Sequence, residues 1–181
     1  MRTTETTRVL LLPGWLNSDP EHWQSCWERQ YGDERVEQSD WNWPRRGDWM
    51  ARLDEVVLAG PGPAVLVAHS LGCQLVASWA EHSAHTARVK GALLVAPPDT
   101  EAPDTPPQLH NWRPIRRTRL PFPAVAVISS DDPYCSPERG VQMAADWGAE
   151  LLMAGPRGHL NTASNLGTWP EGRALLADWM A

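Results

Sequence analysis

The residues from Pro63 to Val76 contain the sequence feature that most restricts the fold of this chain, a short apolar strand followed at once by a helix. The run 64–68 is apolar throughout and is bounded by glycine and proline, which is typical of a fully buried parallel strand. After Ser70 the apolar residues recur at helical spacing, so a tight turn must join the two elements. A serine on such a turn projects its Oγ at the C-terminal edge of the sheet, where the N–H groups of a helix N-terminus stabilise negative charge.

The turn has the sequence Ala68-His69-Ser70-Leu71-Gly72, a variant of the Gly-x-Ser-x-Gly sequence found around hydrolase nucleophiles. Small residues are needed on both sides of such a serine because backbone and side chain crowd there, and alanine is the smallest residue after glycine. Ser70 is therefore a candidate nucleophile, and the N–H of Leu71 is a candidate donor to a developing oxyanion. A second interpretation is that Ser70 only caps the following helix, because serine accepts hydrogen bonds from the first N–H groups of helices.

Further apolar runs bounded by turn residues predict strands at residues 8–12, 35–38, 89–96, 122–130 and 150–153. Helical spacing predicts helices that end near residues 31, 59, 83, 147 and 180. Strands that alternate with helices predict an α/β fold in three layers, with about six mainly parallel strands and helices on both faces of the sheet. We expect a single domain over residues 1–181, because the proline-rich stretch 97–121 is too short for a cap domain. This stretch indicates a long loop, in which a helical turn could form.

Helix boundaries can be predicted from the turn residues beside them. Asn17, Ser18 and Asp19 are candidate caps for the first helix, and Gly32 is expected to end it. Asp48 is expected to cap the second helix, and the last helix is expected to run without a break from Thr168 to Met180.

A serine hydroxyl is a weak nucleophile that needs a histidine base, which a carboxylate usually orients. Of the six histidines, His159 follows the last expected strand, which returns it to the same edge of the sheet as Ser70. We expect His159 to be the base, with His110 in the proline-rich loop as the alternative, and we expect His69 to pack under the turn. Three histidines are expected to be solvated on helix surfaces: His22, His82 and His85.

The carboxylate is expected after the strand 122–130, in the sequence Asp131-Asp132-Pro133. An acid at this strand end can reach a histidine on the next strand-end loop, and we choose Asp132 over Asp131. Aspartate before proline also starts turns readily, so the pair could serve the turn alone. The order serine, aspartate, histidine along the chain is that of α/β-hydrolases.

A second oxyanion donor is expected in the loop after the first strand, where Gly14 permits a turn and the N–H of Trp15 can face the oxyanion. Leu16 replaces Trp15 in this role if the turn is offset by one residue.

The composition has 11 Trp and a single Phe, and the tryptophans at positions 41 and 43 follow a strand end. Trp41 and Trp43 are candidate walls of a pocket for an apolar acyl or aryl group, although they could equally pack the loop onto the sheet. Leu16 and Leu160 are two further candidate pocket residues.

The net charge of −6 speaks against nucleic acid or an anionic membrane as the main partner, because both need a basic face. No apolar run reaches the ~20 residues of a membrane span, and the polar start of the sequence lacks the apolar region of a signal peptide. We therefore expect a cytoplasmic protein. The three cysteines are widely separated and indicate neither a disulfide framework nor a zinc site, and the expected chemistry needs no metal or cofactor.

Together these residues resemble the RBBP9/YdeN family of small serine hydrolases. The resemblance lies in these segments, which occur in the family's order: Leu12-Pro13-Gly14, Glu21-His22-Trp23, Asp40-Trp41, Asp48-Trp49, Ala68–Gly72, Ser130–Tyr134 and Gly158–Asn161. It implies a minimal α/β-hydrolase fold without a cap, a triad of Ser70, Asp132 and His159, and hydrolysis of small esters or amides.

The expected activity is thus that of a serine hydrolase, most simply a carboxylesterase (EC 3.1.1) that acts on a small-molecule ester or amide. A binding protein that keeps this scaffold is the competing interpretation, because tryptophan is favoured at interaction sites and a protein partner is not excluded. A third interpretation is an aminopeptidase-like hydrolase, in which an acidic residue holds the substrate amine. Asp40, Asp131 and Glu138 are the candidates for that acid.

Overall fold

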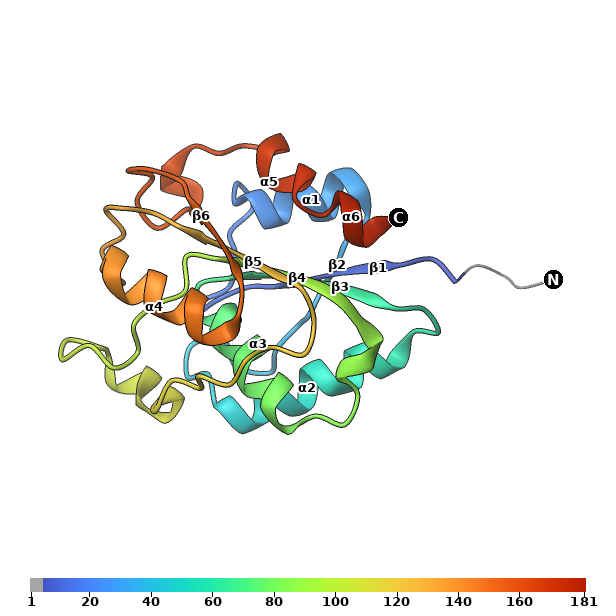
Figure 1. Cartoon of the computed structure of the whole chain (residues 1–181), viewed down its shortest axis with the longest axis horizontal. Coiled ribbons are helices and arrows are strands. Elements are labelled where there is room, and N and C mark those ends of the chain that lie inside the picture. Colours follow the sequence, from blue (N-terminus) through green and yellow to red (C-terminus); the bar gives the residue numbers. More distant parts are fainter. Residues whose placement is uncertain (1–4) are drawn as a thin grey trace.

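A computed structural model describes residues 5–181 as one parallel sheet between two layers of helices (Figure 1). Its strands are β1 (Arg8–Leu12), β2 (Glu34–Arg35), β3 (Ala64–His69), β4 (Val89–Val95), β5 (Ala124–Ile128) and β6 (Glu150–Met153). They are ordered β2-β1-β3-β4-β5-β6, and every neighbouring pair is parallel. The expected six-stranded α/β sheet is confirmed, and within residues 5–181 no cap domain is added to it.

The longer helices are α1 (Trp23–Tyr31), α2 (Arg46–Ala59), α3 (Leu71–His82) and α4 (Pro137–Trp147). Two short helices, α5 (Pro170–Ala174) and α6 (Ala177–Met180), lie beside α1 on one face, whereas α2, α3 and α4 cover the other face (Figure 1). Side chains of a strand alternate between the two faces. Leu10 and Leu12 of β1 accordingly belong to the apolar cluster under α2 and α3, and Val9 and Leu11 belong to the cluster under α1.

Three helix boundaries differ from the sequence prediction. The cap of α1 is His22, whose Nδ1 accepts a hydrogen bond from the N–H of Gln24 (3.1 Å), rather than a residue of 17–19. Helix α2 begins at Arg46, so Asp48 lies in its first turn instead of capping it. The expected last helix is divided into α5 and α6, and α5 begins only after Trp169, whose φ of +42° is not helical. Gly32 ends α1 as predicted, with a φ of +71°.

The remaining differences concern the ends of strands: β5 covers only Ala124–Ile128 of the expected 122–130, and β4 ends one residue before the expected 96. Strand β2 has only two residues instead of the expected four, although the N–H of Val36 still donates to the carbonyl of Leu11 (2.9 Å). The stretch 97–121 contains two 3₁₀ turns from Pro107 to Trp112, and buried Leu109 and Trp112 anchor it to the core. Shorter 3₁₀ helices lie at Thr86–Arg88 and Thr162–Ser164. None of the helices in residues 5–181 has the length and apolar composition needed to cross a membrane.

Candidate active site

Ser70 lies on a strained turn between β3 and α3, with φ +55° and ψ −123°. This conformation is rarely adopted by residues other than glycine, and such strain is concentrated at functional sites. The turn has close neighbours: a Cβ on Gly72 would overlap the carbonyl oxygen of Leu12, and a Cβ on Gly14 would lie 2.9 Å from that of Ser70. The two glycines therefore allow the loop after β1 to lie directly against the turn. The side chain of Ser70 makes no capping hydrogen bond to α3, which disfavours the capping interpretation.

His159 is hydrogen-bonded on both sides. Its Nε2 lies 2.8 Å from Ser70 Oγ, and its Nδ1 lies 2.9 and 3.0 Å from the two carboxylate oxygens of Asp132. A carboxylate only accepts, so Nδ1–H donates to Asp132 and Nε2 is left to accept the hydroxyl proton of Ser70. The side chains are 9% exposed for His159 and 3% exposed for Asp132, which strengthens both contacts.

The neighbouring aspartates have different partners. Asp132 also accepts from the N–H of Tyr134 (2.9 Å), and the Tyr134 ring packs edge-on against His159. Asp131 instead accepts from the hydroxyl of Ser129 (3.0 Å) and from the N–H of Gly158 (2.7 Å). Asp131 therefore contacts the backbone of the loop that carries His159, whereas Asp132 contacts its imidazole.

The loop after β1 lies against the turn at Ser70, and its N–H groups differ in whether a hydrogen bond already uses them. The N–H of Leu16 donates to the carbonyl of Trp41 (3.1 Å), whereas no hydrogen bond within residues 5–181 uses the N–H of Trp15. Leu71 begins α3, where the first N–H groups have no partner inside the helix. The N–H groups of Trp15 and Leu71 thus stay candidate donors to an oxyanion, whereas the N–H of Leu16, the alternative to Trp15, already donates to Trp41.

A cavity of about 590 Å³ opens over Ser70 and His159, within the usual size range of small-molecule sites. Its apolar part is lined by Leu16, Leu71, Pro98, Pro106 and Leu109. Its polar part is lined by Asn17, Asp19, His22, Asn161 and Thr162. The carboxylate of Asp19 accepts from the Thr162 hydroxyl (2.8 and 2.9 Å), and these bonds help to hold its pKa below the ordinary value although burial opposes them. We find no cationic side chain among the residues that line this cavity.

Three expected pocket residues lie outside this lining. Trp41 packs edge-on against Trp49 over the core, and half-exposed Trp43 lies on the same loop. Leu160 is buried in the apolar cluster under α1. The alternative that the loop packs onto the sheet holds for Trp41, whereas Trp43 is left half exposed where the chain turns at Asp40, whose carboxylate accepts from the N–H groups at positions 42 and 43 (2.9 Å each). Of the four expected residues only Leu16 lines the cavity.

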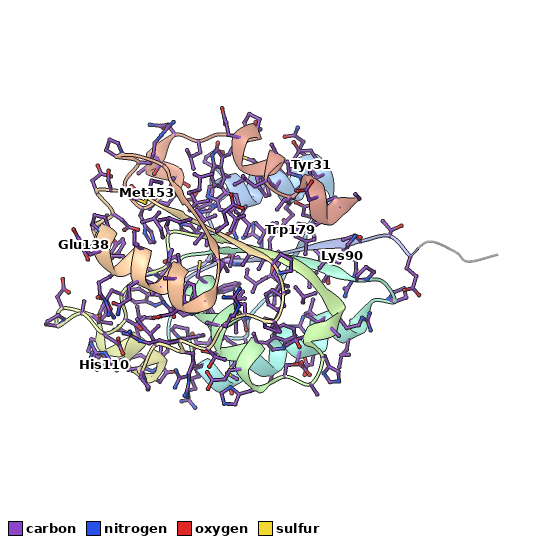
Figure 2. The ribbon with its side chains drawn as sticks, in the orientation of Figure 1. Tyr31, Lys90, His110, Glu138, Met153 and Trp179 are labelled. Atoms are coloured by element: carbon purple, nitrogen blue, oxygen red, sulfur yellow. The ribbon has the colours of Figure 1, made fainter. Side chains whose placement is uncertain are left out.

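The other candidate acids and bases also lie elsewhere. His110 is exposed and bonds to the carbonyl of Thr105 (2.9 Å), and Glu138 lies on the outer side of α4; both are seen at the periphery in Figure 2. Asp19 was not identified from the sequence as a lining residue. The signal that could have found it is its position five residues after Gly14, on the loop that passes the oxyanion.

His22, expected on the surface, is only 3% exposed and packs edge-on against His69, with ring centroids 4.6 Å apart. Burial lowers the pKa of His22 to about 4 and lowers the pKa of His69 well below its ordinary value. Both imidazoles are therefore neutral at physiological pH. The sequence prediction for His22 was wrong because the start of α1 turns this cap residue inward, toward the sheet.

The comparisons with known proteins identify the family and the fold of this chain. A model of the family described as "Serine hydrolase" matches residues 9–178. A solved structure named as a YdeN-like hydrolase from Pectobacterium atrosepticum superposes with a TM-score of 0.84 at 27% identity, covering 97% of this chain and 91% of the other. The ydeN gene product of Bacillus subtilis superposes with a TM-score of 0.73 at 20% identity, covering 96% and 98%. No curated protein sequence matches this chain significantly. The expected resemblance to YdeN-type hydrolases is confirmed.

Proposed function

Because this chain belongs to the serine hydrolase family, we propose that it hydrolyses small carboxylic esters, or amides, through Ser70, His159 and Asp132. The observation that carries the proposal is the position of the His159 imidazole, 2.8 Å from Ser70 Oγ and 2.9 Å from Asp132 at the floor of one cavity. Hydrogen-bond reach on both sides of an imidazole is the arrangement that converts serine into a nucleophile.

In the first half of the reaction, Ser70 Oγ bonds to the substrate carbonyl carbon while its proton passes to His159 Nε2. The carbonyl oxygen becomes an oxyanion, which accepts hydrogen bonds from the N–H groups of Leu71 and Trp15. The bond to the leaving group then breaks, and His159 gives its proton to the departing alcohol or amine. Asp132 holds the Nδ1–H and stabilises the imidazolium while it exists.

In the second half, water attacks the acyl group on Ser70. His159 removes a proton from this water, and a second oxyanion forms in the same position. When the bond between Oγ and the acyl carbon breaks, Ser70 regains the proton and the carboxylic acid leaves. Each oxyanion donor contributes ~3 kcal/mol to lowering the barrier.

The apolar part of the cavity favours an acyl or aryl group, since Leu16, Leu71 and Leu109 offer it no charge. Some structural neighbours are named as esterases or a lipase, among them an esterase from Rhodococcus, with a TM-score of 0.67 at 14% identity, and a monoacylglycerol lipase from Paleococcus ferrophilus, with a TM-score of 0.71 at 12% identity. Their low identity limits the likeness to the fold, so support for ester substrates comes from the cavity.

A second candidate function is hydrolysis of amino-acid esters or short peptides, and one observation favours it. The Asp19 carboxylate lines the same cavity as Ser70, where it can attract a substrate amine. The three acids expected in that role do not line this cavity: Asp40 and Asp131 make the backbone contacts described above, and Glu138 lies on α4.

The test is labelling with a fluorophosphonate, read by intact mass, on the wild type and on Ser70→Ala, with exposed Ser39→Ala as the control. We expect one adduct in the wild type and in Ser39→Ala, and none in Ser70→Ala. Hydrolysis of 4-nitrophenyl acetate should follow the same pattern. A folded wild type that takes up no probe would favour the binding-protein interpretation, and unchanged turnover in Ser70→Ala would remove Ser70 from the mechanism.

A further inference from the structure

His69, the residue before the candidate nucleophile, is hydrogen-bonded to the main chain of the candidate base. Its Nε2 lies 2.9 Å from the carbonyl oxygen of His159. A carbonyl only accepts, so Nε2 must carry the proton and donate it. This one contact joins the turn that holds Ser70 to the loop that holds His159, two segments 90 residues apart in sequence.

The loop that carries His159 lies between β6 and the 3₁₀ helix Thr162–Ser164, so His159 itself belongs to no strand or helix. Strand β6 ends at Met153, and the loop then passes through three residues in the left-handed region: Gly155 (φ +73°), Gly158 (+61°) and Leu160 (+50°). A leucine in that region is uncommon and persists only where its surroundings hold it. The position of the imidazole therefore depends on the contacts that other segments make with this loop.

Two ring N–H groups hold consecutive carbonyls of this loop. His69 donates to the carbonyl of His159, and the indole of Trp23 donates to the carbonyl of Leu160 (2.9 Å). The two rings are perpendicular and pack together, with centroids 6.1 Å apart. Both side chains are buried, at 5% exposure for His69 and 1% for Trp23, so neither bond competes with bulk water.

We propose that His69 is a positioning residue, whose Nε2–H sets the distance between the His159 imidazole and Ser70 by holding the His159 carbonyl. This inference rests on the proposed function. His69 touches neither Ser70 Oγ nor the imidazole nitrogens through any hydrogen bond within residues 5–181, and so acts through the backbone.

The neutrality of His69 fits this role. Its ring lies 4.9 Å from the His159 ring, which becomes an imidazolium during the proposed reaction. A second positive charge at that distance would oppose the imidazolium, whereas a neutral ring can keep donating from Nε2 throughout.

The test compares His69→Gln with His69→Asn, which have the same chemistry but differ by one methylene. The amide nitrogen of glutamine occupies about the position of histidine Nε2 and can still reach the carbonyl. The asparagine side chain is too short to bring its amide nitrogen there. A misplacement on the order of 1 Å can cost about 10²-fold in rate. We therefore expect His69→Asn to lower kcat for 4-nitrophenyl acetate about 10- to 100-fold with KM nearly unchanged. His69→Gln should recover most of the loss.

A second readout does not depend on catalysis. Hydrogen exchange of the amides from 157 to 164 should be faster in His69→Asn than in His69→Gln, because only the first loses the contact to the loop. Exposed His110→Asn is the control and should change neither kcat nor exchange. If the asparagine variant does not fold, His69→Met replaces it as a variant of similar length without a donor.

Equal kcat and equal exchange in the two His69 variants would overturn the positioning role. A lower kcat in both His69 variants, with no difference between them in hydrogen exchange, would also overturn it, since the effect would not act through the loop. If exchange is faster in His69→Asn but the fluorophosphonate does not label the wild type, the contact from His69 to the loop is supported and the proposed function is contradicted.

Discussion

The molecule has two tryptophan clusters, one on each face of the sheet, and they support different halves of the candidate site. The cluster under α1 consists of Trp23, Trp27 and Trp169, with centroids 4.9 to 6.2 Å apart. The cluster near α2 consists of Trp41, Trp49 and Trp112, with consecutive centroids 5.4 and 5.6 Å apart. We call them the base-side cluster and the oxyanion-side cluster.

Both clusters use indole N–H groups to hold loop carbonyls. On the base side, Trp23 and Trp27 donate to the carbonyls of Leu160 (2.9 Å) and Thr168 (2.7 Å), both in the chain after β6. On the oxyanion side, Trp112 donates to the carbonyl of Pro44 (2.9 Å). Phenylalanine has the apolar ring but no donor, which gives a physical reason for so many tryptophans beside so few phenylalanines.

The clusters differ in how directly they reach the chemistry. The base-side cluster contacts the residue that follows His159. The oxyanion-side cluster contacts the segment 40–44, which in turn supports the loop after β1: the carbonyl of Trp41 accepts from the N–H of Leu16 (3.1 Å), and the Trp15 indole donates to the carbonyl of Asn42 (2.8 Å). The many tryptophans of this sequence therefore hold loops in place. The comparison predicts substitutions whose effects on kcat or stability decrease in the order given below.

The largest expected effect is that of Asp132→Asn, against which the effects of the tryptophan substitutions can be compared. Asp132→Asn keeps the acceptor for the Tyr134 N–H but removes the charge beside His159 Nδ1. We expect kcat to fall about 10³- to 10⁴-fold, as for a triad that loses its orienting carboxylate. The matched Asp131→Asn should lose no more than about tenfold, because Asp131 contacts the Ser129 hydroxyl and the backbone of the loop that carries His159, not the imidazole. Equal losses, measured with 4-nitrophenyl acetate, would contradict the assignment of Asp132.

The next effect concerns the stability of the α1 face against acid. The folded pKa of His22 is about 4, below the ordinary value of 6.5, so the unfolded chain binds a proton first as the pH falls. The stability that neutral His22 contributes is complete above pH 6.5 and is lost between pH 6.5 and 4, a loss of about 3 kcal/mol.

His22→Asn tests this prediction, because asparagine is a good cap that can accept from the Gln24 N–H without titrating. Urea unfolding at pH 7, 5.5 and 4.5 should show a smaller loss of stability in the variant than in the wild type. His85→Asn, at a half-buried site away from α1, is the control. An unchanged pH dependence in His22→Asn would show that His22 is not held neutral.

A smaller effect separates the two clusters directly. Trp23→Phe leaves the buried carbonyl of Leu160 without its donor and should lower the free energy of unfolding by about 1–3 kcal/mol. Trp112→Phe should cost no more than this, because the side-chain amide of Asn111 still donates to the carbonyl of Pro44 (3.1 Å). Only Trp23→Phe should also lower kcat, by about tenfold, because Trp23 donates to the carbonyl of Leu160, the residue that follows His159. Chemical denaturation and steady-state kinetics on both variants provide the test. A matching fall of kcat in Trp112→Phe would remove the distinction between the clusters.

The smallest effect concerns charge selection in the cavity between the two clusters. Asp19→Asn should weaken the binding of a cationic ester such as acetylthiocholine. Its KM should rise a few-fold, since exposed ion pairs are worth about 0.2–1 kcal/mol. The uncharged 3,3-dimethylbutyl thioacetate has nearly the same shape and should keep its KM. Equal changes for both thioesters would mean that Asp19 acts through its hydrogen bonds to the Thr162 hydroxyl rather than through its charge.

The local features of this protein were predictable because they depend on neighbouring residues. Apolar runs ended by turn residues predicted strands β1 and β6 with their observed bounds, and α4 ends at Trp147, before Gly148, as predicted. The parallel sheet follows from the alternation of elements. Because the carboxyl ends of parallel strands meet at one edge, the sequence alone also indicated that Ser70, Asp132 and His159 would lie near one another.

Contacts between distant loops were decided only by the tertiary structure. The sequence pattern of α1 could not reveal that its cap, His22, turns inward against His69, since burial at a helix start depends on what packs there. Likewise Trp41 could have lined the cavity or packed the loop onto the sheet, and in the folded chain it packs edge-on against Trp49. Periodicity assigns a residue to a face of its own element, whereas the packing of the folded chain determines which other segment that face meets.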